Sequence, residues 1–179
     1  MILIRPETAN DHAKVRRVTT EAFSASEFGY NGEADLVKRL RACECVRSFV
    51  AMDKNEIVGH ILFTPASIKN NNKELCGMAL GPMAVAPSHQ NNGIGASLIR
   101  FGLQRLSSDD CPFVIVLGHT EYYPRFGFKR AKNFGIAHGF SGIPQDVFFI
   151  NILNQDSVQT ISNGVAFYLP DFGTQHDGT

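Results

Sequence analysis

Tryptophan is absent from the 179 residues, and only 19% of them are Asp, Glu, Lys or Arg. This low charged fraction, beside 44% hydrophobic residues, argues against a disordered chain and favours a well-filled core. Lysine and arginine number 17 together, as do aspartate and glutamate, so the formal net charge is zero. Because no excess of positive charge is available to neutralise phosphates, we do not expect binding to nucleic acid.

Motifs for metals, export and membranes are also missing. The four cysteines form no C-x-x-C pair and have no histidines at zinc spacing, so we expect reduced, mostly buried thiols and no metal site. Residues 1–6 lack the basic start and apolar run of a signal peptide, which predicts a cytoplasmic location. Residues 75–99 carry no formal charge, but Pro82, Pro87 and a polar run interrupt them, so they do not form a membrane helix.

The charges that are present are unevenly distributed. All 17 basic residues lie at or before Lys132, together with 13 acidic ones, so residues 1–132 carry a net charge of +4 and the rest −4. One interpretation is that the last segments are strands and a loose tail without an electrostatic role. The other is that an anionic ligand lies on the first part and an amine approaches the second.

Hydrophobic periodicity predicts the secondary structure. Runs rich in β-branched and aromatic residues predict strands at 2–5, 46–52, 57–68, 75–85, 113–117, 128–137, 147–153 and 164–169. Helices are expected to begin at Thr8–Asp11 and at Glu33, to cover 93–106, and to include a short one at 122–126.

The order of these elements predicts a mixed α/β fold. Polar turns between the strands of 46–85 indicate an antiparallel meander. The strand, helix and strand of 75–117 indicate one parallel crossover, whose ligands would gather at the carboxyl ends of the strands. Because the chain has no repeat or low-complexity linker, we expect a single domain over 1–170 and a polar tail over 171–179.

A glycine pair lies between the uncharged strand and the helix that follows it. Gly93 and Gly95 at the start of a helix favour a tight turn that leaves several main-chain N–H groups exposed, and such groups attract phosphate. The alternative interpretation is a tight turn with close helix packing. The run Gly93–Leu98 does not complete the dinucleotide fingerprint, and the chain has no G-x-x-x-x-G-K-[ST] motif.

Glycine and proline also interrupt the strand before this turn. Gly81-Pro82 predicts a bulge or an edge, because proline removes a main-chain donor from the ladder. A bulged strand would separate from its neighbour at 114–117. The gap could admit an extended chain containing amides, with its diphosphate end at 90–96.

Together these residues resemble the GNAT N-acetyltransferase superfamily. The resemblance rests on Gln90-x-x-Gly93-x-Gly95 after a Met-Ala-Val strand end, and on the run Tyr122-Tyr123-Pro124-Arg125-Phe126-Gly127-Phe128. A bacterial subfamily with a leucine-glycine-proline strand is the most similar, and the likeness extends more weakly to about Leu153. It implies an α+β fold with a largely antiparallel sheet, splayed central strands and flanking helices.

The resemblance further implies that acetyl-coenzyme A is the acetyl donor, and it implies neither a metal nor a flavin. The implied donor-binding residues are Met83, Ala84 and Val85 along the pantetheine, and Gln90, Asn91, Asn92, Gly93, Ile94, Gly95 and Ala96 around the diphosphate. Relatives usually have a basic residue or glycine where this chain has Asn91-Asn92, which would weaken donor binding.

Acetyl transfer to an amine needs a neutral amine and a proton for the departing thiolate. Tyr123 is the expected general acid, since a phenol is protonated at neutral pH. Relatives often place a glutamate base on the strand matching 75–85, but none follows Glu74 here. His119, where many relatives have asparagine, and Glu33 remain candidates for the base, and a chain of water molecules could replace either.

These candidates also have purely structural interpretations. Glu33 at the start of a helix suits the helix dipole. His60 shares a strand face with Val58 and Leu62, so we expect a core histidine. Tyr122 is expected to pack beside Tyr123.

We therefore predict an N-acetyltransferase that moves acetyl from acetyl-coenzyme A to a primary amine by direct attack. The acceptor is a small-molecule amine or a protein amino group, no membrane or nucleic acid is expected as partner, and a homodimer is left open. A non-catalytic acyl-coenzyme A sensor is the alternative, and an oxidoreductase that binds NAD is a third interpretation.

Overall fold

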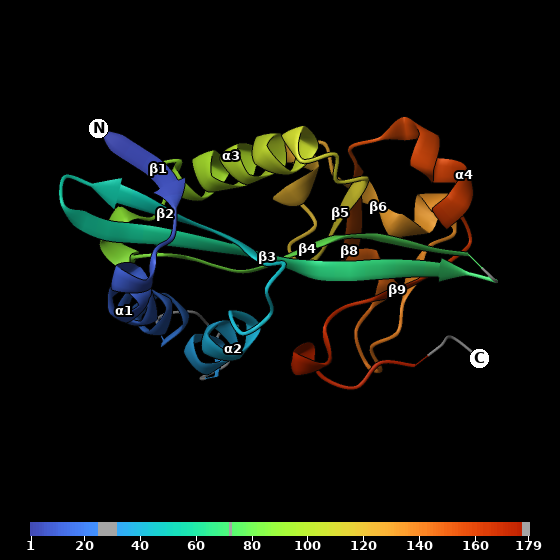
Figure 1. Ribbon diagram of the computed structural model, residues 1–179, viewed down its shortest axis with the longest axis horizontal. Coiled ribbons are helices and arrows are strands. Elements are labelled where there is room, and N and C mark those ends of the chain that lie inside the picture. Colours follow the sequence, from blue (N-terminus) through green and yellow to red (C-terminus); the bar gives the residue numbers. More distant parts are fainter. Residues whose placement is uncertain (25–31, 72, 177–179) are drawn as a thin grey trace. The chain divides into compact units, whose positions relative to one another are not determined.

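The computed structural model describes residues 1–24, 32–71 and 73–176 of the chain, and Figure 1 labels most of its helices and strands. The strands are β1 (Ile2–Pro6), β2 (Arg47–Asp53), β3 (Glu56–Asn70), β4 (Lys73–Val85), β5 (Phe113–Leu117), β6 (Lys129–Arg130), β7 (Ala137–His138), β8 (Phe148–Ile152) and β9 (Val165–Phe167). The α-helices are α1 (His12–Ser24), α2 (Glu33–Leu40), α3 (Ile94–Ser108) and α4 (Val158–Ile161).

The strands form a mixed sheet in the hydrogen-bonded order β1-β2-β3-β4-β5-β8-β6, with β9 beside β3 and β7 beside β9. Most of the ladders with a defined register are antiparallel, and β4–β5 and β7–β9 are parallel. The predicted α+β fold, with a largely antiparallel sheet and flanking helices, is therefore confirmed. A doubly wound parallel sheet, on which the NAD-binding interpretation relied, does not fit this order.

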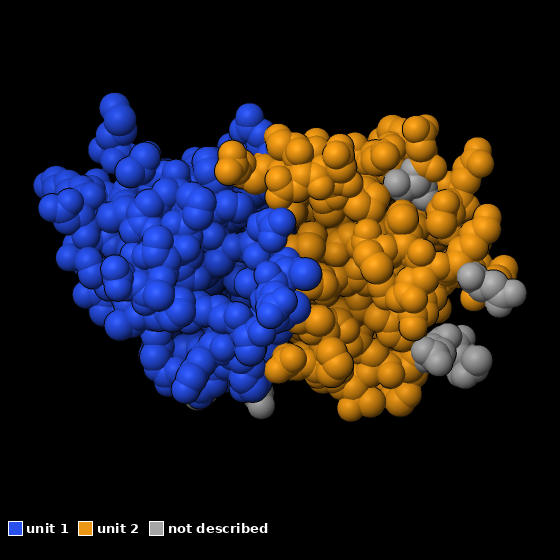
Figure 2. Space-filling model, in the orientation of Figure 1, with its two compact units in different colours: residues 1–63, 81–104 blue, residues 64–80, 105–179 orange. Residues whose placement is uncertain are grey.

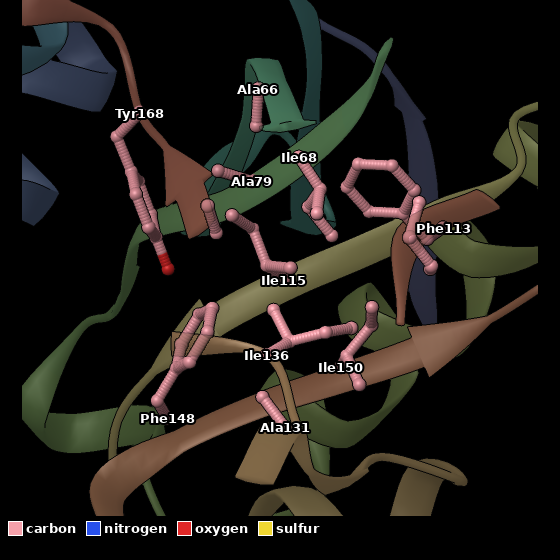
Figure 3. Packing of buried hydrophobic residues seen from close by; sticks show 12 residues of the cluster. Ala66, Ile68, Ala79, Phe113, Ile115, Ala131, Ile136, Phe148, Ile150 and Tyr168 are labelled. Atoms are coloured by element: carbon pink, nitrogen blue, oxygen red, sulfur yellow. The ribbon is translucent and has the colours of Figure 1, made fainter. Parts of the chain in front are cut away.

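The chain divides into two compact units (Figure 2), and β3, β4 and α3 contribute residues to both. Unit 1 comprises residues 1–63 and 81–104, and unit 2 comprises 64–80 and 105–179. In unit 1 a hydrophobic cluster joins the two first helices to the sheet through Val15, Val18, Ala22, Val37, Val50, Ile57, Ala84 and Ala86. In unit 2 a larger cluster gathers around Phe113, Ile115, Phe148 and Ile150 (Figure 3).

The first helix begins where the sequence predicts. Thr8 donates hydrogen bonds from its main-chain N–H and its hydroxyl to Asp11, at 2.7 and 2.8 Å. The Arg5 guanidinium donates hydrogen bonds to the same carboxylate from Nη1 at 2.7 Å and from Nη2 at 2.8 Å. The hydrogen bond from Arg5 is the main cause of the lowered pKa of Asp11. The short segment after β1 is therefore fixed before α1 starts.

Two predictions about local structure are wrong. The strand expected over 128–137 is split into β6 and β7, because a short 3-10 helix at Ala131–Phe134 ends at Gly135 with a φ of +69°. The cysteines are free as predicted but not mostly buried, since Cys45 and Cys76 are exposed. Cys76 lies on β4 before the buried run of that strand.

A buried polar network joins four elements of unit 1. The Arg41 guanidinium, at the end of α2, donates two hydrogen bonds to the carboxylate of Glu7, one of them from Nε at 3.1 Å. Ser48 on β2 donates to the same carboxylate, and its hydroxyl lies 2.9 Å from Nε2 of His60 on β3. His60 is completely buried, as predicted for a core histidine.

The charges of this network follow from its burial. Burial lowers the pKa of His60, so its ring is neutral at pH 7. Burial alone would raise the pKa of Glu7, but His60, Arg41 and Ser48 together lower it to about 2. With His60 neutral, Arg41 is the cation that keeps Glu7 ionised.

We predict that Glu7→Gln lowers the free energy of unfolding by about 3 kcal/mol or more at pH 7, because it leaves the Arg41 guanidinium partly buried without its anion. Urea unfolding followed by circular dichroism measures this loss. The folded-state pKa of Glu7 is lowered from 4.5 to about 2, so its stabilisation is present above pH 4.5. The difference between wild type and variant should therefore shrink as the pH falls from 4.5 towards 2.

Glu56→Gln is the matched control, since Glu56 forms an exposed ion pair with Arg17 at 3.1 Å. An exposed pair contributes about 0–1 kcal/mol. Equal losses in the two variants would contradict the role assigned to the Glu7 network.

Candidate active site

The candidate donor site lies in unit 1, where β4 ends. After Val85 the chain makes a short 3-10 turn at Pro87–His89 and enters α3 at Ile94. The N–H of Ala86 donates to Val58 on β3 at 2.9 Å, which fixes the strand end. The Gln90 side chain folds back and donates from Nε2 to the Val85 carbonyl at 3.0 Å.

The turn before α3 leaves the first main-chain donors of the helix without a helical partner. Gly93 is exposed with a φ of +77°, and the first i to i−4 hydrogen bond of the helix runs from Ser97 N to the Gly93 carbonyl at 2.9 Å. The N–H groups of Ile94, Gly95 and Ala96 therefore have no partner inside the helix. A Cβ at Gly93 would meet no atom within 4 Å, so the space beside Gly93 is open.

The predicted donor-binding residues differ in which of their groups are available to a ligand. The side chains of Ala84, Ile94 and Ala96 are buried, so only their main-chain groups are available. Met83 and Val85 are half-buried, whereas Gln90, Asn91 and Asn92 are exposed. The arrangement can hold a phosphate through main-chain N–H groups at the positive end of the α3 dipole.

The β4–β5 ladder is short. Its residue pairs are Met78 with Val114 and Ala79 with Ile115. Gly81 follows with a φ of +137°, which agrees with the interruption that the sequence predicts at Gly81-Pro82. Met83, Ala84 and Val85 lie beyond this point on β4.

Sequence reasoning missed His89, which stands directly before the loop. Its Nδ1 lies 2.9 Å from the Ser88 hydroxyl, and its Nε2 lies 3.8 Å from the carboxylate of Asp53 in the β2–β3 hairpin. The ring thus connects the turn before Gln90 to the hairpin. In the sequence, the one signal for a role of His89 is its position next to the glycine motif.

Tyr123, the predicted acid, belongs to unit 2. It begins a 3-10 helix at Tyr123–Phe126 that ends at Gly127 with a φ of +86°, as the sequence predicts. Its ring is 8% exposed and packs edge-on against Tyr122 at 5.4 Å and Phe128 at 5.7 Å between centroids. Burial, and then the neighbouring Tyr122, raise the pKa of the phenol, so Tyr123 is protonated at neutral pH.

The candidates for the base are divided between the units. His119 in unit 2 is exposed. Glu33 in unit 1 is half-buried at the start of α2, and its Oε2 is buried with no hydrogen-bond partner among the described residues. Glu74 is exposed and pairs with Lys69 at 3.8 Å. These contacts favour neither residue, and His119 and Glu33 both stay predictions for the general base.

In residues 1–24, 32–71 and 73–176 no group of His, Cys, Asp and Glu side chains is arranged to hold a metal ion. Over the same residues, no helix combines the length and apolar character needed to cross a membrane.

Comparison with known proteins gives consistent matches. A family model described as "Acetyltransferase (GNAT) domain" matches residues 3–131. The "Uncharacterized N-acetyltransferase YjhQ" of Escherichia coli K12 is 42% identical over 123 residues, which are 67% of this chain and 65% of that protein. The matched part thus spans slightly less than two thirds of that relative.

Two solved structures are similar over nearly the whole chain. A GNAT family acetyltransferase from Brucella melitensis in complex with acetyl-CoA superposes with a TM-score of 0.79 at 30% identity, covering 97% of this chain and 99% of that one. The GNAT family N-acetyltransferase YhbS from Escherichia coli, in complex with CoA, has a TM-score of 0.85 at 25% identity, covering 96% and 91%.

We predict that Gly118→Ala displaces the Tyr123 ring, because a Cβ at Gly118 would overlap that ring. Overpacking of this kind costs about 1–3 kcal/mol. Thermal unfolding and the near-ultraviolet circular dichroism of the tyrosines measure the effect. A double-mutant cycle with Tyr123→Ala is the control, since the cost should largely disappear once the ring is gone. Additive losses would contradict the clash.

Proposed function

Because the chain belongs to the GNAT acetyltransferase family, we propose that it transfers the acetyl group of acetyl-coenzyme A to a primary amine. The observation that carries this proposal is the exposed turn at Gly93, after which the N–H groups of residues 94–96 have no partner inside α3. Two structural relatives that are complexes with acetyl-CoA or CoA support the choice of donor.

In this proposal the donor is bound mainly by main-chain groups. Met83, Ala84 and Val85 bind the pantetheine arm, whose amides match the hydrogen-bonding groups of an extended strand. The loop from Gln90 to Ala96 binds the diphosphate. The loop contains no lysine or arginine, so its attraction comes from N–H groups and the helix dipole rather than from formal charge.

The reaction proceeds by direct attack. The lone pair of the neutral amine attacks the thioester carbonyl carbon, a C–N bond forms, and the C–S bond breaks. The departing thiolate takes the phenolic proton of Tyr123, and a base takes the proton that the newly bonded nitrogen loses. Return of a proton to the tyrosinate, from that base or from solvent, completes the cycle. Glu33, His119 or a water molecule is that base. Burial raises the pKa of Tyr123, so the phenol carries its proton at neutral pH.

We predict that coenzyme A and acetyl-coenzyme A raise the melting temperature, since a ligand that binds only the folded state stabilises it. At a concentration a hundredfold above the dissociation constant the gain is about 2.7 kcal/mol. NAD at equal concentration is the control and should cause no shift. Gly93→Val should weaken the effect, because a side chain there blocks the open turn and strains a φ of +77°. A shift with NAD and none with coenzyme A would contradict the proposal.

We predict that Tyr123→Phe lowers kcat about a hundredfold or more with little change in the KM for acetyl-coenzyme A, because the ring stays while its proton is lost. Thiol release in the presence of a panel of amines measures both constants. Tyr122→Phe is the matched control and should retain activity. If both variants keep the wild-type rate, Tyr123 is not the acid. If the wild type binds coenzyme A but acetylates no amine, the chain is an acyl-coenzyme A sensor.

A further inference from the structure

The segment between β5 and β6 carries Tyr123, and its beginning is tied to the residue before β8. The N–H of Gly118, directly after β5, donates to the carbonyl of Val147 at 2.9 Å. Val147 immediately precedes β8. A Cβ at Gly118 would overlap the Tyr123 ring, so the chain passes that ring at close range. The start of the segment is therefore fixed next to β8.

The side chains of β8 alternate between two environments. Phe148 and Ile150 belong to the hydrophobic cluster of unit 2 (Figure 3). Phe149 and Asn151 point to the other side of the strand, because successive side chains of a strand alternate. The ring centroids of Phe149 and Tyr123 lie 6.4 Å apart. This second side of β8 is therefore the one that supports the short 3-10 helix begun by Tyr123.

Asn151, on the same side of β8, holds the last residue of that helix. Its half-buried side chain donates from Nδ2 to the main-chain carbonyl of Phe126 at 2.9 Å. Phe126 is followed by Gly127, whose φ of +86° ends the helix. A Cβ at Gly127 would lie only 3.3 Å from Nδ2 of Asn151. The glycine therefore allows the sharp turn and also leaves room for the amide to reach the carbonyl.

The helix is so short that its two ends move together. Tyr123 and Phe126 are its first and last residues, and side chains three apart in a 3-10 helix lie one above the other. A single helical turn is not stable by itself, so contacts with the rest of unit 2 set its position. A shift of the Phe126 carbonyl would therefore carry the Tyr123 ring with it.

On the basis of the proposed function, we propose that Asn151 is a positioning residue: by holding the end of the helix on β8, it keeps the Tyr123 phenol where it meets the departing thiolate. In this role Asn151 acts through Tyr123 rather than on the donor or the acceptor. The proposal also gives a reason for the glycine within the run 122–128, since Gly127 makes room for the Asn151 amide.

A positioning role and a merely structural role of Asn151 differ in what a substitution changes. If the hydrogen bond only supports the fold, its loss lowers the melting temperature, and each folded molecule keeps its rate. If it positions Tyr123, its loss lowers kcat in the folded protein. The KM for acetyl-coenzyme A then stays nearly the same, because the proposed donor-binding residues all lie in unit 1.

Steady-state kinetics of folded Asn151→Leu tests the proposal, since leucine has a similar size and no donor. We expect kcat to fall about tenfold, the value of one lost hydrogen bond. Asn151→Asp keeps the shape, but its carboxylate has no proton for the Phe126 carbonyl at neutral pH, so it should lose as much. Asn70→Leu is the matched control and should keep the wild-type kcat, because Asn70 also donates from Nδ2 to a main-chain carbonyl of unit 2, that of Ser162.

A double-mutant cycle shows whether Asn151 acts through Tyr123. Once Tyr123→Phe has removed the phenolic proton, the position of the ring should no longer affect the rate, so adding Asn151→Leu should lower kcat no further. The proposal is overturned if the two losses add, if Asn151→Leu and Asn151→Asp keep the wild-type kcat, or if Asn70→Leu loses as much as they do.

Hydrogen exchange followed by mass spectrometry adds a measurement that needs no turnover. A peptide covering residues 118–128 should exchange faster in Asn151→Leu than in the wild type or in Asn70→Leu. Unchanged exchange would overturn the proposal by itself, because Asn151 would then not hold the helix. The proposed function fails by a different result, when the wild type acetylates no amine or Tyr123→Phe alone keeps the wild-type rate, and the proposal then fails with it.

Discussion

An α-helix cannot satisfy the N–H groups of its first turn, and in α3 those groups belong to Ile94, Gly95 and Ala96. In most helices a capping side chain or water satisfies them. Here Gly93 precedes them, with a φ of +77° and open space beside it. The proposed donor site depends on this arrangement, and β4 leads directly into the turn.

The two units meet opposite physical requirements. The turn proposed to bind phosphate lies at the end of β4 in unit 1, where Gly93 is exposed, and buried contacts, including the Glu7 network, hold the rest of the unit. The proposed acid is instead buried, since unit 2 packs Tyr123 among aromatic rings. The same burial that protects the proton also restricts the ring, and Gly118 leaves room for it.

Much of the fold follows from local patterns in the sequence. The strand, helix and strand over 75–117 were predictable because apolar spacing and the glycine pair agree there. The split between β6 and β7 was not, since it depends on Gly135 packing against Asn163 far along the chain. Of the candidate site, the turn at Gly93 was predictable from the motif. His89 escaped because its contact with Asp53 joins residues distant in sequence, which no local pattern reveals.

The composition of the loop has one more consequence. From Gln90 to Ala96 no side chain can gain or lose a proton between pH 3 and pH 11, since the loop holds only amides, glycines and small aliphatic residues. In the proposed function these side chains therefore make no pH-dependent contribution to diphosphate binding. We expect the pH dependence of the proposed reaction to come mainly from the acetyl-transfer end, where the amine, its base and Tyr123 would exchange protons.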